Sequence, residues 1–145
     1  MKRLLSLLLP LMILLSLTSC RLLDDREDKG LICGFVSSNR DMLMECIESG
    51  DYSPLQKVFI IHDINPSDSG STVDFFCGGA GFGSETVYRG FFYSSAKSMF
   101  AVWCAPSARE LDEYGSGYMW RESNGDNTYY VEEICENFYY YEAEY

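Results

Sequence analysis

Hydrophobic and polar positions divide the chain into three stretches of different character. Residues 4–17 form an almost unbroken run of Leu, Ile and Met, which three residues interrupt. Residues 21–29 are polar and highly charged, with little that a core could bury. From residue 30 onward, short apolar runs alternate with clusters of Gly, Pro, Ser, Asn and Asp. This pattern predicts one folded domain over residues 30–145, preceded by a charged tether and an apolar N-terminal segment.

Residues 38–50 carry the periodicity of an amphipathic helix. Their apolar positions recur at intervals of three to four residues, Ser38 stands where a helix is capped, and Gly50 stands where one ends. This predicts one short helix of about three turns. The preceding run, residues 30–36, fits either a strand or the lead-in to this helix. The apolar positions of the predicted helix are Met42, Leu43, Cys46 and Ile47.

From residue 56 onward the pattern is typical of β-structure, with β-branched and aromatic residues in short runs separated by turn-forming residues. Short turns at 124–126 and 136–137 predict that the last three strands form consecutive hairpins. We therefore expect an α+β fold, with one short N-terminal helix packed on a predominantly antiparallel, twisted sheet of six or seven strands. The predicted strands are 57–62, 72–77, 86–93, 98–104, 117–122, 127–134 and 138–145.

The final predicted strand shows which of its faces is buried. Alternate residues of a strand point to opposite faces of the sheet. One set holds three tyrosines and Ala143, whereas the other set mixes Phe138 and Tyr140 with two glutamates. We expect the first set to face the core and the second to face outward.

The N-terminal segment indicates where the protein goes. Lys2 and Arg3 precede the apolar run 4–17, which at 14 residues with a proline is too short for a spanning helix of about 20. The run closes with Leu17-Thr18-Ser19-Cys20, which resembles the lipobox of bacterial lipoproteins. That resemblance implies cleavage after residue 19 and lipid on Cys20. A plain secretory signal is the alternative.

This resemblance sets the expected organisation of the chain. Residues 1–19 are a signal peptide that is removed, residues 20–29 are the lipidated cysteine and tether, and residues 30–145 are a single α+β domain. The protein would be exported and lipid-anchored to the outer face of the cell membrane, or to the outer membrane where the host has two membranes. Its acyl chains in the lipid bilayer would hold it there without a transmembrane helix.

The charge balance narrows the classes of partner. The chain has 11 basic and 22 acidic residues, and loss of Lys2 and Arg3 with the signal peptide would leave 9 against 22, a net charge of −13. Its basic residues are scattered singly, which argues against nucleic acid and against docking flat on anionic lipid. A basic envelope or secreted protein is the partner that such a charge favours.

The cysteines other than Cys20 leave their pairing open. None stands in a CxxC pattern, and with a single histidine, His62, the chain offers no metal-ligand spacing, so we expect no metal and no cofactor. A bridge between Cys77 and Cys104 would require a sheet that is not a simple meander. An odd number leaves at least one thiol unpaired within the chain. The possible disulfide cysteines are Cys33, Cys46, Cys77, Cys104 and Cys135.

Patterns that could indicate catalysis each have a simpler structural explanation. His62 precedes Asp63, but the chain has no nucleophile elbow. The glycine-rich segment 78–83 lacks a following Lys-Ser/Thr and is expected to be a hairpin connection. Oxygen-bearing residues between Asp63 and Asp74 resemble a calcium loop, but Asp68 stands at its glycine position. We therefore expect a protein that is not an enzyme.

Aromatic excess in an acidic setting is the feature that suggests a function. Aromatic residues make up 15% of the chain, and strand alternation places some of them outward beside glutamates. Exposed Tyr and Trp often anchor recognition surfaces. The favoured interpretation is a binding module; the alternatives are an inhibitor or immunity-type protein against a basic cell-wall hydrolase, and a sugar- or peptide-binding module. The candidate interaction residues are Tyr118, Trp120, Tyr130, Glu132, Tyr140 and Glu142.

Overall fold

The computed structural model describes residues 25–82, 85–107 and 110–145. Contacts divide the chain into two units, residues 1–31 and Ile32–Tyr145, and the second unit holds nearly all of the described residues. The expected signal peptide and Cys20 lie outside the described residues. Among the described residues, no helix is long and apolar enough to cross a membrane.

Within the described part of the chain, two α-helices precede the sheet, where the sequence predicted one. Helix α2 spans Asp25–Ser38 and helix α3 spans Arg40–Ser49. The chain breaks between them at Asn39, whose side-chain amide donates a 2.8 Å hydrogen bond to the carbonyl of Phe35. Helix α3 ends as predicted at Gly50, which adopts a left-handed conformation (φ 70°) that favours glycine. Residues 25–29, expected as part of the tether, form the beginning of α2.

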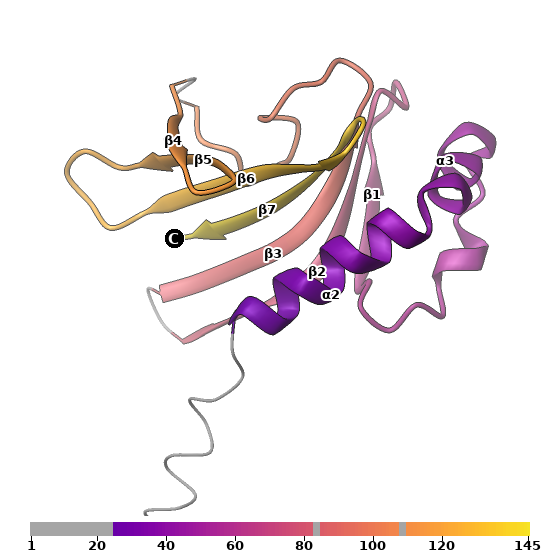
Figure 1. The fold of residues 1–145 in the computed structure, drawn as a ribbon, viewed down its shortest axis with the longest axis horizontal. Coiled ribbons are helices and arrows are strands. Elements are labelled where there is room, and N and C mark those ends of the chain that lie inside the picture. The colour runs from indigo at the N-terminus through magenta and orange to yellow at the C-terminus, as the bar shows by residue number, and fades with distance from the viewer. Residues whose placement is uncertain (1–24, 83–84, 108–109) are drawn as a thin grey trace, which may run out of the picture. The chain divides into compact units, whose positions relative to one another are not determined.

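The sheet has seven antiparallel strands in the order β1-β2-β3-β7-β6-β5-β4 (Figure 1). The predicted α+β class is therefore confirmed, and so are the last two hairpins, because β5, β6 and β7 are neighbours in sequence and in the sheet. A short 3-10 helix, η2 (Ser53–Leu55), connects α3 to the sheet. The strands are β1 (Asp63–Pro66), β2 (Thr72–Phe82), β3 (Glu85–Ser94), β4 (Asp112–Tyr114), β5 (Gly117–Arg121), β6 (Thr128–Cys135) and β7 (Phe138–Glu144).

Three predictions for the β-structure were wrong, two of them about apolar segments and the third about the glycine-rich segment. Residues 57–62 and 98–104 are rich in apolar residues but form turns and loops, from which Val58, Ile61, Val102 and Cys104 pack against the sheet. The backbone N–H of His62 donates to the carbonyl of Phe76 in β2, just before β1 begins. The glycine-rich segment after residue 77 is not a hairpin connection but continues β2 as far as Phe82. A β-carbon at Gly79 would lie 2.2 Å from the carbonyl of Val87, so the close approach of β2 and β3 requires glycine there.

The sheet is buried on both of its faces. The helix-side cluster joins residues of α2, α3 and η2 to Phe75, Phe91 and Tyr140. On the opposite, loop-side face, Val102 and Cys104 from the segment between β3 and β4 cover the sheet. Members of the loop-side cluster on the strands are Phe92, Tyr129, Val131, Tyr139, Tyr141 and Ala143.

Strand β7 lies near the middle of this three-layer arrangement, with β3 on one side and β6 on the other. Of its predicted core set, Tyr139, Tyr141 and Ala143 are buried on the loop side, and Tyr145, just beyond the strand, is partly buried there. The expectation that the other set faces outward was wrong for Phe138 and Tyr140, which are 0% and 1% exposed beneath the helices. Both faces of a central strand are covered here, so alternation alone could not identify one buried face.

The five described cysteines are free thiols. Cys77 packs against the helix-side cluster, whereas Cys104 belongs to the loop-side cluster, so the two lie in different parts of the core. Burial raises the pKa of each of these two thiols to about 12. A Cys77–Cys104 bridge would therefore require the packing to rearrange.

Candidate functional site

The register of the C-terminal strands divides the six candidate interaction residues between two faces. In the β6–β7 pair, Tyr130 lies opposite Glu142, and Glu132 lies opposite Tyr140. These four residues share the helix-side face. Tyr118 and Trp120 instead lie opposite Val131 and Tyr129, on the loop-side face. The six residues therefore do not form one surface, but four of them do.

Hydrogen bonds join these four residues in two tyrosine–glutamate pairs, and the Tyr130 and Tyr140 rings link the pairs into one network. The Tyr130 hydroxyl donates to Glu132 Oε2 at 2.5 Å, and the Tyr140 hydroxyl donates to Glu142 Oε2 at 3.1 Å. Arg89 Nε, from β3, donates to the same Glu142 oxygen at 2.8 Å. Arg89 is only 8% exposed, and sequence reasoning did not select it, because the pairing of β3 with β7 brings it to the last strands.

Burial decides how much of the network is open to solvent. Tyr140 is fully buried, and desolvation, with the neighbouring Glu142 carboxylate, raises the pKa of its hydroxyl far above its usual range. Its hydroxyl therefore stays protonated and donates. The side chain of Glu142 is 36% exposed, against 10% for Arg89. Tyr140 and Arg89 thus fix the carboxylate from beneath and leave part of it open to solvent.

Tyr114 extends the network to the edge of the sheet. The Tyr114 ring meets the Tyr130 ring edge-on, with centroids 6.3 Å apart, and Tyr130 in turn contacts Tyr140 at 6.3 Å. Tyr114 is 52% exposed. Gly117 makes room for this row, because a β-carbon there would lie 2.8 Å from the Tyr130 hydroxyl. We call Tyr114, Tyr130, Glu132, Tyr140 and Glu142 the tyrosine–acid surface.

The C-terminal part of the chain, which supplies the tyrosine–acid surface, is strongly negative. Residues 110–145 contain ten acidic residues and a single basic residue, Arg121. The Arg121 guanidinium lies 5.6 Å from the centroid of the Tyr114 ring, within the range of a cation–π contact. Sequence reasoning did not select Tyr114 or Arg121, because only the pairing of β4 with β5 brings them to this face. The exposed acidic residues of this region are Glu110, Asp112, Glu113, Glu122, Asp126, Glu133, Glu136 and Glu144.

Both edges of the sheet resist pairing with another strand. Edge strand β1 has four residues and ends in Pro66, which cannot donate a backbone hydrogen bond. Edge strand β4 has three exposed residues, two of them acidic. Short, charged or proline-bearing edges disfavour strand addition. Both edges therefore offer little backbone for the addition of another strand.

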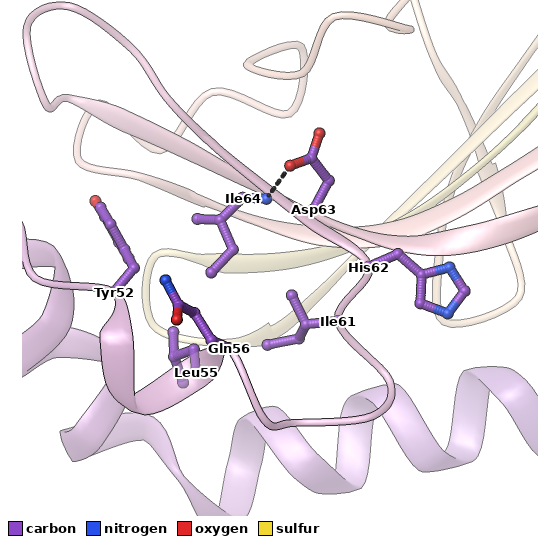
Figure 2. Close-up of a pocket in the computed structure, with 7 residues that line it drawn as sticks. All are labelled: Tyr52, Leu55, Gln56, Ile61, His62, Asp63 and Ile64. Atoms are coloured by element: carbon purple, nitrogen blue, oxygen red, sulfur yellow. Dashed lines mark hydrogen bonds between the residues drawn. The ribbon is translucent and has the colours of Figure 1, made fainter.

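A separate cavity lies between η2 and β1, with a volume of about 340 Å³. Leu55, Ile61 and Ile64 form an apolar lining, with Tyr52 and Gln56 beside them (Figure 2). The other two lining residues, His62 and Asp63, point away from the apolar group in this view. His62 instead packs edge-on against the Phe76 ring, with centroids 6.2 Å apart. The lining residues contain no nucleophile placed beside a base.

Asp74 is a buried carboxylate that the sequence analysis did not single out. It is 5% exposed on the loop-side face, and neither of its oxygens has a hydrogen-bond partner among the described residues. Burial raises its pKa to about 6. The Tyr141 hydroxyl and the Asn65 side chain lie near enough to oppose part of that rise, although neither meets the geometry of a hydrogen bond. Among the described residues, no group of three or more His, Cys, Asp or Glu side chains could hold a metal ion.

Comparison with known protein families, curated proteins and solved structures finds no match to this chain.

Proposed function

We propose that the protein is a non-enzymatic binding module that presents the tyrosine–acid surface to a basic protein. The observation that carries this proposal is the row of three tyrosine rings beside anchored carboxylates, within a region of ten acidic residues and one arginine. Opposite charge accelerates association and selects partners, while ordered aromatic side chains offer contact area at low entropic cost.

The order of the network supports recognition rather than catalysis. Glu132 and Glu142 each accept a tyrosine hydrogen bond, and Glu142 also pairs with buried Arg89. Carboxylates held in this way keep one orientation and do not need to be reorganised when a cation binds. An inhibitor of a basic cell-wall hydrolase would use the same surface and would differ only in what the captured protein does.

An affinity pull-down from the host's envelope extract tests the proposed function. The immobilised protein is washed at low and then at high salt. We expect a basic protein to bind at low salt and to be released at high salt, because screening weakens exposed charge pairs. If that protein is a cell-wall hydrolase, its activity should fall when the complex forms.

A different outcome would contradict the proposed function. Capture of nothing basic, combined with a change in tyrosine and tryptophan fluorescence on adding glycans or neutral peptides, would favour the sugar- or peptide-binding alternative. Such binding should not depend on salt, because it involves stacking rather than charge.

We also propose that the chain is exported and lipid-anchored through Cys20, on the strength of the lipobox resemblance. Mass spectrometry of the mature N-terminal peptide should find acyl chains on Cys20, and fractionation should find the protein with membranes. A Cys20→Ser variant should lose both properties. An unmodified Cys20, or cleavage at another position, would contradict this proposal.

A further inference from the structure

We propose that residues 98–105, which we call the cover segment, open away from the loop-side face of the sheet when the Asp74 carboxyl group loses its proton. The cover segment belongs to the connection between β3 and β4, and its side chains Val102 and Cys104 are 7% and 4% exposed in the loop-side cluster. The tyrosine–acid surface lies on the opposite face, so opening of the cover segment does not depend on the proposed function.

Tyrosine side chains, rather than a ladder of backbone hydrogen bonds, attach the cover segment to the sheet. Its residues form turns and bends and belong to no strand. The Tyr129 hydroxyl donates to the carbonyl of Met99 at 2.7 Å, and the Tyr145 hydroxyl donates to the carbonyl of Cys104. A segment without ladder bonds opens at a lower free-energy cost than a strand does.

Two buried polar side chains without hydrogen-bond partners lie on the face that the cover segment protects. Asp74 is 5% exposed and Tyr141 is 0% exposed, and among the described residues neither the Asp74 oxygens nor the Tyr141 hydroxyl has a partner. Tyr141 belongs to the same cluster as Val102 and Cys104. After burial, the charge of Asp74 is the next cause that raises the pKa of the Cys104 thiol, so this carboxyl group lies close to the cover segment.

The surroundings of Asp74 do not compensate a negative charge. Burial raises its pKa, the Tyr141 hydroxyl and the Asn65 side chain oppose part of that rise, and the Asp63 carboxylate adds to it. Among the described residues, the groups that act on Asp74 include no positive charge. The titratable groups that face Asp74 are Asp63 on β1, Cys77 on β2, Tyr129 on β6, Tyr141 on β7 and Cys104 on the cover segment.

Ionisation of Asp74 therefore favours the open state. A buried carboxylate without hydrogen bonds is costly, whereas opening of the cover segment lets water reach it. The Asp74 pKa is about 6 in the closed state and near 3.8 for a solvated aspartate, so the proportion of open molecules should rise between about pH 4 and pH 6 and level off above that. A difference of roughly two pKa units allows a rise of about a hundredfold at most.

Labelling of two equally buried cysteines tests this inference. Cys104 on the cover segment is 4% exposed, and Cys46 on α3, in the helix-side cluster, is 3% exposed. The full chain, purified in mild detergent, is treated with 4,4′-dithiodipyridine at pH 4 and at pH 7, and mass spectrometry of its peptides measures the labelling rate of each thiol. We expect the ratio of the Cys104 rate to the Cys46 rate to rise at least about tenfold between these two pH values. In Asp74→Asn the ratio should stay nearly constant.

A matched pair of tyrosine variants tests how the cover segment is attached. Tyr129→Phe removes the hydrogen bond to the Met99 carbonyl. Tyr139→Phe removes a hydroxyl of the same cluster that, among the described residues, forms no hydrogen bond to the cover segment. We expect Tyr129→Phe to raise the Cys104 rate about threefold to tenfold at both pH values, and Tyr139→Phe to leave it within about twofold.

Three results would overturn the inference. A ratio that does not change with pH in the unaltered chain would show that the cover segment stays closed. Equal acceleration at Cys104 and Cys46 would show that the whole domain loosens. A pH-dependent ratio that persists in Asp74→Asn, in a protein whose circular dichroism shows that it has folded, would assign the opening to another group.

Discussion

Replacement of Gly90 by alanine is expected to lower the free energy of unfolding by about 3 kcal/mol. A β-carbon at this position of β3 would lie 2.5 Å from the carbonyl oxygen of Phe75 and 2.8 Å from two atoms of the Tyr141 side chain. The Phe75 carbonyl belongs to the neighbouring strand β2 and cannot move without disturbing the sheet. The Tyr141 ring would be displaced from the loop-side core, where it is fully buried.

Urea denaturation at constant pH measures this effect, and Gly34 supplies the control. A β-carbon at Gly34, on the exposed side of α2, meets nothing within 4 Å. Gly34→Ala should therefore raise stability by up to about 1 kcal/mol, as alanine does within a helix. A Gly90→Ala protein with the unfolding midpoint of the unaltered chain would show that β3 and Tyr141 do not pack as described.

The contribution of Asp74 to the free energy of unfolding is expected to fall as pH rises from about 4 to about 7. Its pKa is about 6 in the folded state, against 3.8 for an ordinary aspartate. The folded state therefore binds the Asp74 proton more tightly than the unfolded state does. The stability that this proton contributes is fully present below the pKa of the unfolded state, and it is lost as pH rises through the pKa of the folded state. A shift of roughly two units corresponds to on the order of 3 kcal/mol.

Comparison with an Asp74→Asn variant isolates that component. The difference in unfolding free energy between the unaltered chain and Asp74→Asn should change by about 3 kcal/mol between pH 4 and pH 7, to the disadvantage of the unaltered chain at high pH. Asp68→Asn, at an exposed position in the turn between β1 and β2, should give a nearly constant difference. A constant difference for Asp74→Asn as well would mean that Asp74 is solvated.

The sequence predicted the strands whose local residue pattern matches the way they pair in the sheet. Strands β3, β6 and β7 combine β-branched and aromatic residues with short turns, and the structure places them within one or two residues of the predicted bounds. Residues 57–62 and 98–104 have a similar composition but lie outside the strands, because apolar content alone does not specify strand pairing. It does not guarantee burial either, since Phe59 and Trp103 in these segments are 83% and 63% exposed. Helix α2 was missed because Gly30 and Gly34 weaken its local preference, whereas burial of Ile32 and Val36 stabilises it.

The candidate site was predictable to the extent that it depends on alternation within one strand. Tyr130 and Glu132, like Tyr140 and Glu142, are two residues apart and necessarily share a face. The pairing of β5 with β6, which places Trp120 on the other face, depends on a register that no single segment encodes. Arg89 lies 53 residues before Glu142, so only the β3–β7 pairing brings it to the site.

The central claim is that a basic partner binds the tyrosine–acid surface, and calorimetric titration of the captured partner into two charge-matched variants tests it most directly. Asp112→Asn with Glu132→Gln removes two negative charges at the surface, and Asp41→Asn with Glu48→Gln removes two exposed charges on α3. The account predicts that the surface variant weakens binding at least about tenfold and that the α3 variant weakens it about twofold or less. Equal losses in both variants would show that net charge alone attracts the partner, and would contradict the claim.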